Sequence, residues 1–155
     1  MNTRIGKVSA LLVMAVLLPL STTSCVSVSA GKGQCATQLE NLKEPILAIK
    51  AEDVNQASAS SPEERLRILA KSGQLSSDLG VRAASQAPNC PDSAISSEIA
   101  NLGRYATEEG QAKFDMISAV SIGDTTAYNS AQARATTARD AANATIVKIQ
   151  TLTSR

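Results

Sequence analysis

The sequence predicts an all-α protein, an up-down-up-down four-helix bundle. Aliphatic residues and alanine recur every three or four positions along four long stretches, as on one face of a helix. Short segments rich in glycine, proline and serine separate these stretches, which favours antiparallel neighbours. The 155 residues include one Phe, two Tyr and no Trp, a composition that suits closely packed helices better than a β-sandwich. We place the bundle at residues 36–155.

The first helix is predicted from about Ala36 to Ala57. Pro45 lies inside it and lacks the backbone N–H of a helical residue, so we expect a kink or a restart there. Continuing the apolar spacing would point Asp53 inward, but we favour the neighbouring Val54 as the buried residue of that turn. The preceding apolar positions are Leu39, Leu42, Ile46 and Ile49.

The second helix has the clearest start in the chain. Ser61 can cap it, Pro62 suits the first helical position, and Glu64 completes a capping box. We expect this helix to end before Pro88, with two glycines as its weak points. Its apolar positions and these glycines are Leu66, Leu69, Leu75 and Leu79, and Gly73 and Gly80.

The third and fourth helices are predicted on either side of Gly123. Asp92 or Ser93 caps the third helix, Gly123 ends it in a left-handed conformation, and Asp124 begins the fourth. The alanine-rich stripe of the fourth helix is expected to pack tightly inside the bundle. The predicted buried positions are Ile95, Ile99, Leu102, Ala106, Ile117 and Val120, then Tyr128, Ala131, Ala135, Ala138, Ala142, Thr145, Ile149 and Leu152.

The first 24 residues have the pattern of an export signal. Arg4 and Lys7 precede an apolar run, which leads through a short polar segment to Ser24 and Cys25. The segment resembles the lipobox of bacterial lipoproteins. The resemblance implies that residues 1–24 are removed, that the Cys25 sulfur carries a diacylglycerol, and that its amino group carries a further acyl chain such as palmitate.

This resemblance implies a location in the cell envelope. Two or three acyl chains on one residue give stable anchoring, so we expect the chain on the outer face of a membrane, the outer membrane if the host has one. Residues 25–35 are expected to form a flexible tether. The alternative is ordinary secretion after cleavage at Ala30, whereas the apolar run is too short to span a bilayer.

The cysteine count predicts one disulfide. With Cys25 assigned to the lipid, Cys35 and Cys90 remain as a pair, and outside the cytoplasm such pairs usually form disulfides. In the predicted bundle, the start of the first helix and the end of the second lie at the same end, so the two cysteines can meet. A two-cysteine metal site has no histidine to complete it.

No motif indicates catalysis, a metal site or a cofactor. The absence of histidine removes the usual general base, zinc ligand and haem ligand. Without the signal the chain is nearly neutral, and it has few aromatic residues, so we expect no nucleic-acid binding. We expect the remaining candidate carboxylates to lie on solvated helix faces: Glu52, Asp53, Glu108, Glu109 and Asp115.

These observations predict a non-catalytic, lipid-anchored binding or structural protein of the bacterial cell envelope. Besides the membrane, the expected partner is an envelope protein or a wall polymer. One alternative is a small inhibitor or phage-exclusion type of lipoprotein. Another is a carrier that holds an apolar ligand in the bundle interior, which requires a pocket lined by the leucines and isoleucines named above.

Overall fold

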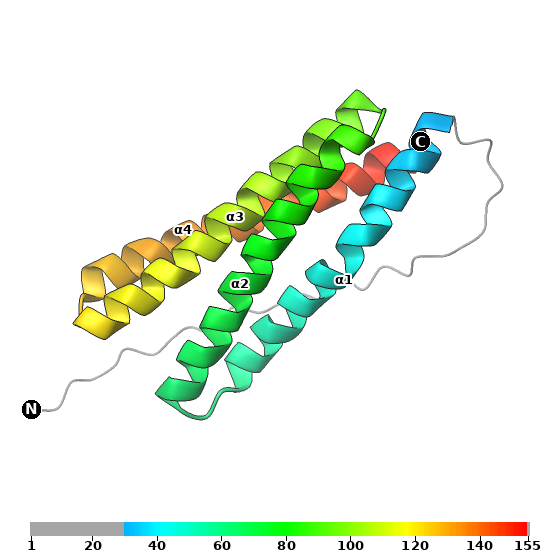
Figure 1. Ribbon diagram of the computed structural model, residues 1–155. Coiled ribbons are helices and arrows are strands. Elements are labelled where there is room, and N and C mark those ends of the chain that lie inside the picture. The colour runs from blue at the N-terminus through cyan, green and yellow to red at the C-terminus, as the bar shows by residue number, and fades with distance from the viewer. Residues whose placement is uncertain (1–29, 155) are drawn as a thin grey trace, which may run out of the picture.

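The computed structural model describes residues 30–154, which form an up-down-up-down bundle of four helices (Figure 1). This confirms the predicted fold class, and the described residues contain no strand. No helix among them is long and apolar enough to cross a membrane. The elements are α1 (Ala30–Ser58), α2 (Pro62–Gln86), the short 3-10 helix η1 (Ala87–Asn89), α3 (Ser93–Ile122) and α4 (Thr125–Thr153).

Helix α1 differs from the prediction at its start and, of the two outcomes expected at Pro45, excludes the restart. It begins at Ala30 rather than Ala36, so residues 30–35 of the expected tether are helical, and residues 25–29 lie outside the described part. It also continues through Pro45 without a restart. A proline costs a helix one backbone hydrogen bond, and the buried position of Pro45 against the rest of the bundle supports the helix despite this loss.

The other helix ends are set by the residues that the sequence indicated. Ser61 Oγ accepts a hydrogen bond from the Glu64 backbone N–H at 3.1 Å, and the Glu64 carboxylate accepts one from the Ser60 N–H rather than from Ser61. Asp92 caps α3, and Gly123, at φ 70°, ends it in the left-handed conformation. These local interactions fix where each helix starts and stops.

The apolar core consists of two clusters. The larger one fills the end of the bundle that holds both cysteines, and its side chains come from all four helices. The smaller one comprises Leu69, Ala112, Met116, Ala131 and Ala135. Two predicted core positions are wrong, since Val54 is 63% exposed and Val120 is 43% exposed.

Helices α2 and α3 pack closely through two pairs of glycines. A Cβ atom added at Gly110 would lie 2.8 Å from the Gly73 carbonyl oxygen, and one at Gly80 would lie 3.0 Å from the Gly103 carbonyl oxygen. Real Cβ atoms hardly ever come so close to a backbone atom, so these positions exclude side chains. The glycines expected to weaken α2 are therefore where the two helices meet.

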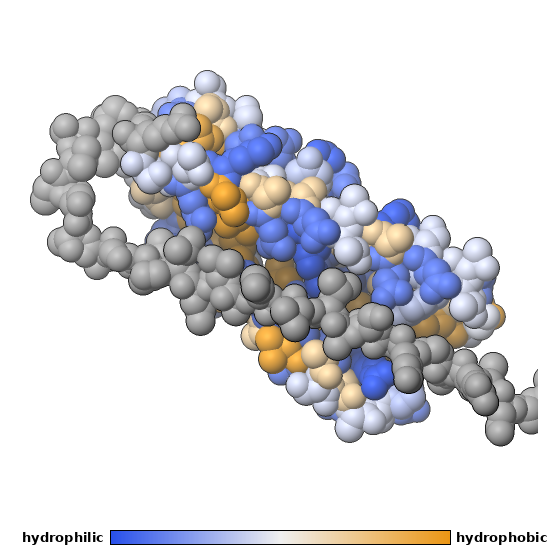
Figure 2. Space-filling model, turned by 180° about the vertical axis from the view of Figure 1, so that it is seen from behind, coloured by the Kyte–Doolittle hydropathy of each residue, from blue (hydrophilic) through white to orange (hydrophobic). Residues whose placement is uncertain are grey.

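The four helices do not stay together along their whole length. Figure 1 shows that they converge at the end where α1 begins and α4 ends, whereas the α1–α2 turn and the α3–α4 turn point apart at the opposite end. We call the first the closed end and the region where the two hairpins diverge the fork. Most of the surface visible in Figure 2 is hydrophilic, with hydrophobic residues in small separate groups.

Candidate functional site

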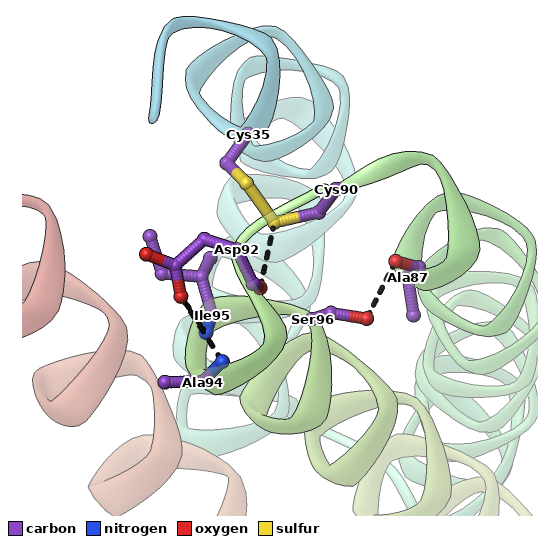
Figure 3. Close-up of a disulfide and its surroundings, with 7 residues drawn as sticks. All are labelled: Cys35, Ala87, Cys90, Asp92, Ala94, Ile95 and Ser96. Atoms are coloured by element: carbon purple, nitrogen blue, oxygen red, sulfur yellow. Dashed lines mark hydrogen bonds between the residues drawn. A yellow bond between two sulfur atoms is a disulfide. The ribbon is translucent and has the colours of Figure 1, made fainter. Parts of the chain in front are cut away.

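The predicted disulfide is present at the closed end. Cys35, in the first turns of α1, is bonded to Cys90 in the connector between α2 and α3, and their Cα atoms are 4.6 Å apart (Figure 3). Both cysteines are buried. The connector is held further by Ser96, whose hydroxyl donates to the Ala87 carbonyl oxygen at 2.7 Å, and by the Asp92 cap of α3. The bond therefore joins α1 to the rest of the bundle where the chain enters it.

Cys25, the predicted site of lipid attachment, lies outside the described residues. Its modification stays a prediction. Ala30, the alternative cleavage point, is the first residue of α1.

A cluster of four charged side chains lies where the two hairpins begin to diverge. We call it the ionic cluster, and it consists of Asp53 from α1, Glu109 and Lys113 from α3, and Arg139 from α4. Lys113 Nζ lies 2.6 Å from Glu109 Oε1 and 4.0 Å from Asp53 Oδ1. Arg139 donates to Glu109 Oε1 through Nε at 3.0 Å and through Nη2 at 2.8 Å, and to Asp53 Oδ1 at 3.0 Å.

Helix α2 contributes two hydroxyl groups to the same cluster. Lys113 Nζ donates to Ser72 Oγ at 2.6 Å and to Ser76 Oγ at 3.4 Å. The Lys113 side chain is 2% exposed and that of Glu109 is 5% exposed. All four helices thus contribute polar atoms to one layer of the interior, and Lys113 has a hydrogen-bonding partner for each of its three N–H groups.

Burial makes the charged forms of this cluster costly. Desolvation raises the pKa of Asp53 above its usual value, even though Arg139 and Lys113 act in the opposite direction. Desolvation likewise lowers the pKa of Lys113, against the effect of Glu109. For Arg139 burial lowers the pKa, but Glu109 and Asp53 outweigh this effect and raise it overall. For Asp53 and Lys113 the attraction within the cluster therefore only partly compensates the loss of hydration, whereas for Arg139 it more than compensates it.

The expectation that the candidate carboxylates all lie on solvated faces is wrong for Glu109 and Asp53, and also for Glu52, which is 7% exposed. Glu109 is 4% exposed, and Asp53 rather than Val54 points inward. Glu108 and Asp115 do lie at the surface, where they pair with Arg104 and Arg134. Two sequence signals pointed to the cluster: Asp53 continues the apolar stripe of α1, and the stripe of α3 is thin around Glu109.

A small cavity adjoins the ionic cluster at the fork. Its volume is about 110 Å³, and all four helices contribute to its walls. Lys113 and Arg139 line it, whereas Asp53 and Glu109 do not. The other lining residues are Gln56, Leu69, Met116, Gln132, Ala135 and Thr136.

A second, larger cavity of about 310 Å³ lies between α1 and α2. Its walls are mainly polar, and within them Lys71 Nζ lies 2.5 Å from Glu52 Oε1. The lining residues are Glu52, Asn55, Ser58, Glu64, Arg67, Ile68 and Lys71.

The described residues contain no group of three or more His, Cys, Asp or Glu side chains placed to hold a metal ion. At the fork cavity, the guanidinium group of Arg139 and the amides of Gln56 and Gln132 can form hydrogen bonds beside a few apolar side chains. Comparison with known proteins found no matching family model, no matching curated protein and no matching solved structure.

Proposed function

We propose that this chain is a lipid-anchored, non-catalytic binding or structural protein of the bacterial cell envelope. The carrying observation is the N-terminal pattern ending in Ser24 and Cys25, which resembles a lipobox. The disulfide between Cys35 and Cys90 supports it, because such bonds form and persist in exported proteins. That bond uses two of the three cysteines and leaves Cys25 for the lipid.

The bundle suits attachment at its closed end. Only nine residues separate Cys25 from Cys35, which lies in the first turns of α1 at that end. Helix α1 has 29 residues and, at 1.5 Å per residue, spans about 44 Å. A lipid on Cys25 would therefore hold the closed end near the headgroups, with the fork on the opposite end of the bundle.

The contacts of the buried charges support a binding rather than a catalytic role. Glu109 and Asp53 are both bonded to cations, and Lys113 is bonded to Glu109 and two serines. Acid and base catalysis needs a group that can exchange a proton with a substrate, and histidine, the commonest such group, is absent from the sequence. We propose an envelope protein or a wall polymer as the partner.

The intact mass of the mature protein from the membrane fraction tests the anchor. We expect a chain that starts at Cys25 and carries acyl groups, and a gain of two hydrogen atoms on reduction of the disulfide. The matched control is Cys25→Ser, which should abolish the lipid adduct and release the chain from the membrane. An unmodified chain that starts at Gly31 would refute anchoring and establish ordinary secretion.

Crosslinking in intact cells tests the binding role. We expect an envelope protein or a wall fragment to be recovered with the anchored chain, and not with a lipoprotein of unrelated fold expressed at the same level. Recovery of no envelope component would contradict this role. The alternative of an apolar carrier gains no support from the two cavities described, because both have mainly polar walls.

A further inference from the structure

The charged residues around the fork cavity are arranged asymmetrically. The two cations of the ionic cluster, Lys113 and Arg139, form part of the cavity wall, whereas the two carboxylates that neutralise them stand behind the wall. The cluster as a whole carries no net charge. At short range, however, the charged group that a molecule in the cavity would meet is the Arg139 guanidinium, since the Lys113 side chain is only 2% exposed.

Arg139 retains hydrogen-bonding capacity toward the cavity. Its Nε and Nη2 atoms donate to Glu109 and Asp53, while its Nη1 atom has no hydrogen-bond partner among the described residues. The side chain as a whole is 37% exposed and lines the cavity. The two carboxylates fix the plane of the guanidinium group and so orient its free N–H groups before any ligand arrives.

Two amides from different helices line the same cavity. Gln56 comes from α1 and Gln132 from α4, and neither side chain is hydrogen-bonded within the described part of the chain. An amide can donate and accept at once, as recognition of a peptide group requires. The buried side chains of Leu69, Met116 and Ala135 supply an apolar floor between them.

The cavity is small and partly open to solvent. Its volume of about 110 Å³ admits several water molecules or a small organic group. A carboxylate with a short aliphatic substituent has this size.

We propose that the fork cavity binds the C-terminal residue of a peptide, with its carboxylate on Arg139 and a small aliphatic side chain on the apolar floor. The amides of Gln56 and Gln132 bond the preceding peptide group. This proposal names a site and a ligand class for the binding role proposed above, on which it rests, and it does not depend on the lipid anchor.

The arrangement favours a weak and directional interaction. The carboxylates of Glu109 and Asp53 oppose any long-range attraction of an anion, so affinity comes from direct hydrogen bonds and from burial of a methyl-sized group. For a ligand with so few buried atoms we expect a dissociation constant on the order of 1 mM. A longer peptide or several copies of it would strengthen binding.

Titration of the isotope-labelled mature protein, followed by NMR, tests the proposal. The probes are acetyl-alanyl-alanine, its C-terminal amide, and acetate. We expect the free peptide to shift the side-chain signals of Gln56, Gln132 and Arg139, and the amide to bind at least tenfold more weakly. Equal binding of the amide, or shifts remote from the fork, would overturn the proposal. If acetate bound as tightly as the peptide, the assignment to a peptide terminus would be wrong.

Variants locate the site independently of the probes. Arg139→Gln should weaken binding at least tenfold, whereas Arg134→Gln, five residues earlier on the same helix and paired with Asp115 at the surface, should leave it unchanged. Because Arg139 also holds the ionic cluster, the double change of Gln56 and Gln132 to Ala serves as a second variant that leaves the cluster intact. Undiminished binding by this double variant, in a chain that folds normally, would also overturn the proposal.

Discussion

The two ends of the bundle are stabilised in different ways. At the closed end, a disulfide and a continuous apolar cluster hold α1 against the other helices. At the fork, α1 is joined to α3 and α4 through the carboxylate of Asp53, in a layer whose charges lose much of their hydration. The difference separates an end held by a disulfide and apolar contacts from an end held by a buried polar layer, beside which we propose that a ligand binds. A fully apolar interior of the same size would be at least as stable.

The largest expected effect concerns the disulfide. Replacing both Cys35 and Cys90 with serine removes a crosslink that closes a loop of 55 residues, and the chain-entropy relation gives a loss of about 4 kcal/mol in the free energy of unfolding. Urea denaturation measures this loss. Chemical reduction of the unchanged protein serves as the control and should give a similar value. A loss below about 1 kcal/mol would mean that the apolar cluster alone holds the closed end.

The next largest effect concerns the ionic cluster. Glu109→Leu leaves Lys113 buried without its nearest carboxylate, and removal of one partner of a buried pair costs about 3 to 5 kcal/mol. Adding Lys113→Met should restore most of the stability, because both buried charges are then gone. Urea denaturation of the single and double variants gives the coupling between them.

The neighbouring residue supplies the matched control for this change. Glu108 is on the same turn but pairs with Arg104 at the surface, so Glu108→Leu should change stability little. Equal losses from Glu108→Leu and Glu109→Leu would contradict the distinction between a buried layer and a solvated face. A double variant as unstable as the single one would show that Lys113 is not the reason for the loss.

A smaller effect is expected where α2 meets α3. Gly110→Ala places a Cβ atom 2.8 Å from the Gly73 carbonyl oxygen, so the helices must separate, and we expect a loss of about 2 kcal/mol. Gly33→Ala in α1 is the control. Its Cβ atom meets nothing within 4 Å, so the gain in helix propensity should stabilise the chain by about 0.5 to 1 kcal/mol. Thermal denaturation measures both variants. If Gly110→Ala and Gly33→Ala shifted the melting temperature in the same direction, this would count against the close approach at Gly110.

The smallest effect is a dependence on pH. Because burial raises the pKa of Asp53, the folded protein binds this proton more tightly than the unfolded chain does, so ionised Asp53 lowers stability as pH rises through its folded pKa. Asp53→Asn removes this cost. We expect it to change the free energy of unfolding by less than about 1 kcal/mol at neutral pH, and to become relatively more favourable as pH increases.

Asp115 provides the opposite case for the same measurement. Its contact with Arg134 lowers its pKa, so ionised Asp115 adds stability that is lost as pH falls through the folded pKa. Asp115→Asn should therefore become relatively less favourable as pH increases. Urea denaturation at several pH values measures the free energy of unfolding of each variant relative to the unchanged protein. If this difference changed with pH in the same direction for both variants, the raised pKa of Asp53 would be refuted.

Much of the fold could be predicted because its determinants are local. The cap at Ser61, the left-handed Gly123 and the cap at Asp124 act within a few residues, so the sequence alone indicates where helices begin and end. The disulfide followed from cysteine count and from the antiparallel order of the helices. The start of α1 was predicted six residues late, because glycines are typical of a tether yet are tolerated in a helix.

The candidate site depends on contacts between distant parts of the chain. Whether Asp53 or Val54 faces inward is decided by Arg139, which lies 86 residues further along. A glutamate four residues before a lysine is typical of a solvated helix face, so the spacing of Glu109 and Lys113 gave no sign of their burial, and only the thin apolar stripe around Glu109 pointed to that turn. The cavity arises because two hairpins diverge, and no local pattern encodes that angle.

The glycine pairs form a sequence pattern that reflects helix packing rather than a functional group. Gly73 and Gly80 are seven residues apart, as are Gly103 and Gly110, and an antiparallel register sets each pair against the other. A related chain can change its surface freely, but the two backbones can approach this closely only if Gly80, Gly103 and Gly110 stay without side chains, whereas a Cβ atom at Gly73 would meet its neighbours at 3.3 Å or more. We therefore expect related chains to be recognised by the spacing of these glycines, with a cysteine between the two pairs, rather than by any conserved functional group.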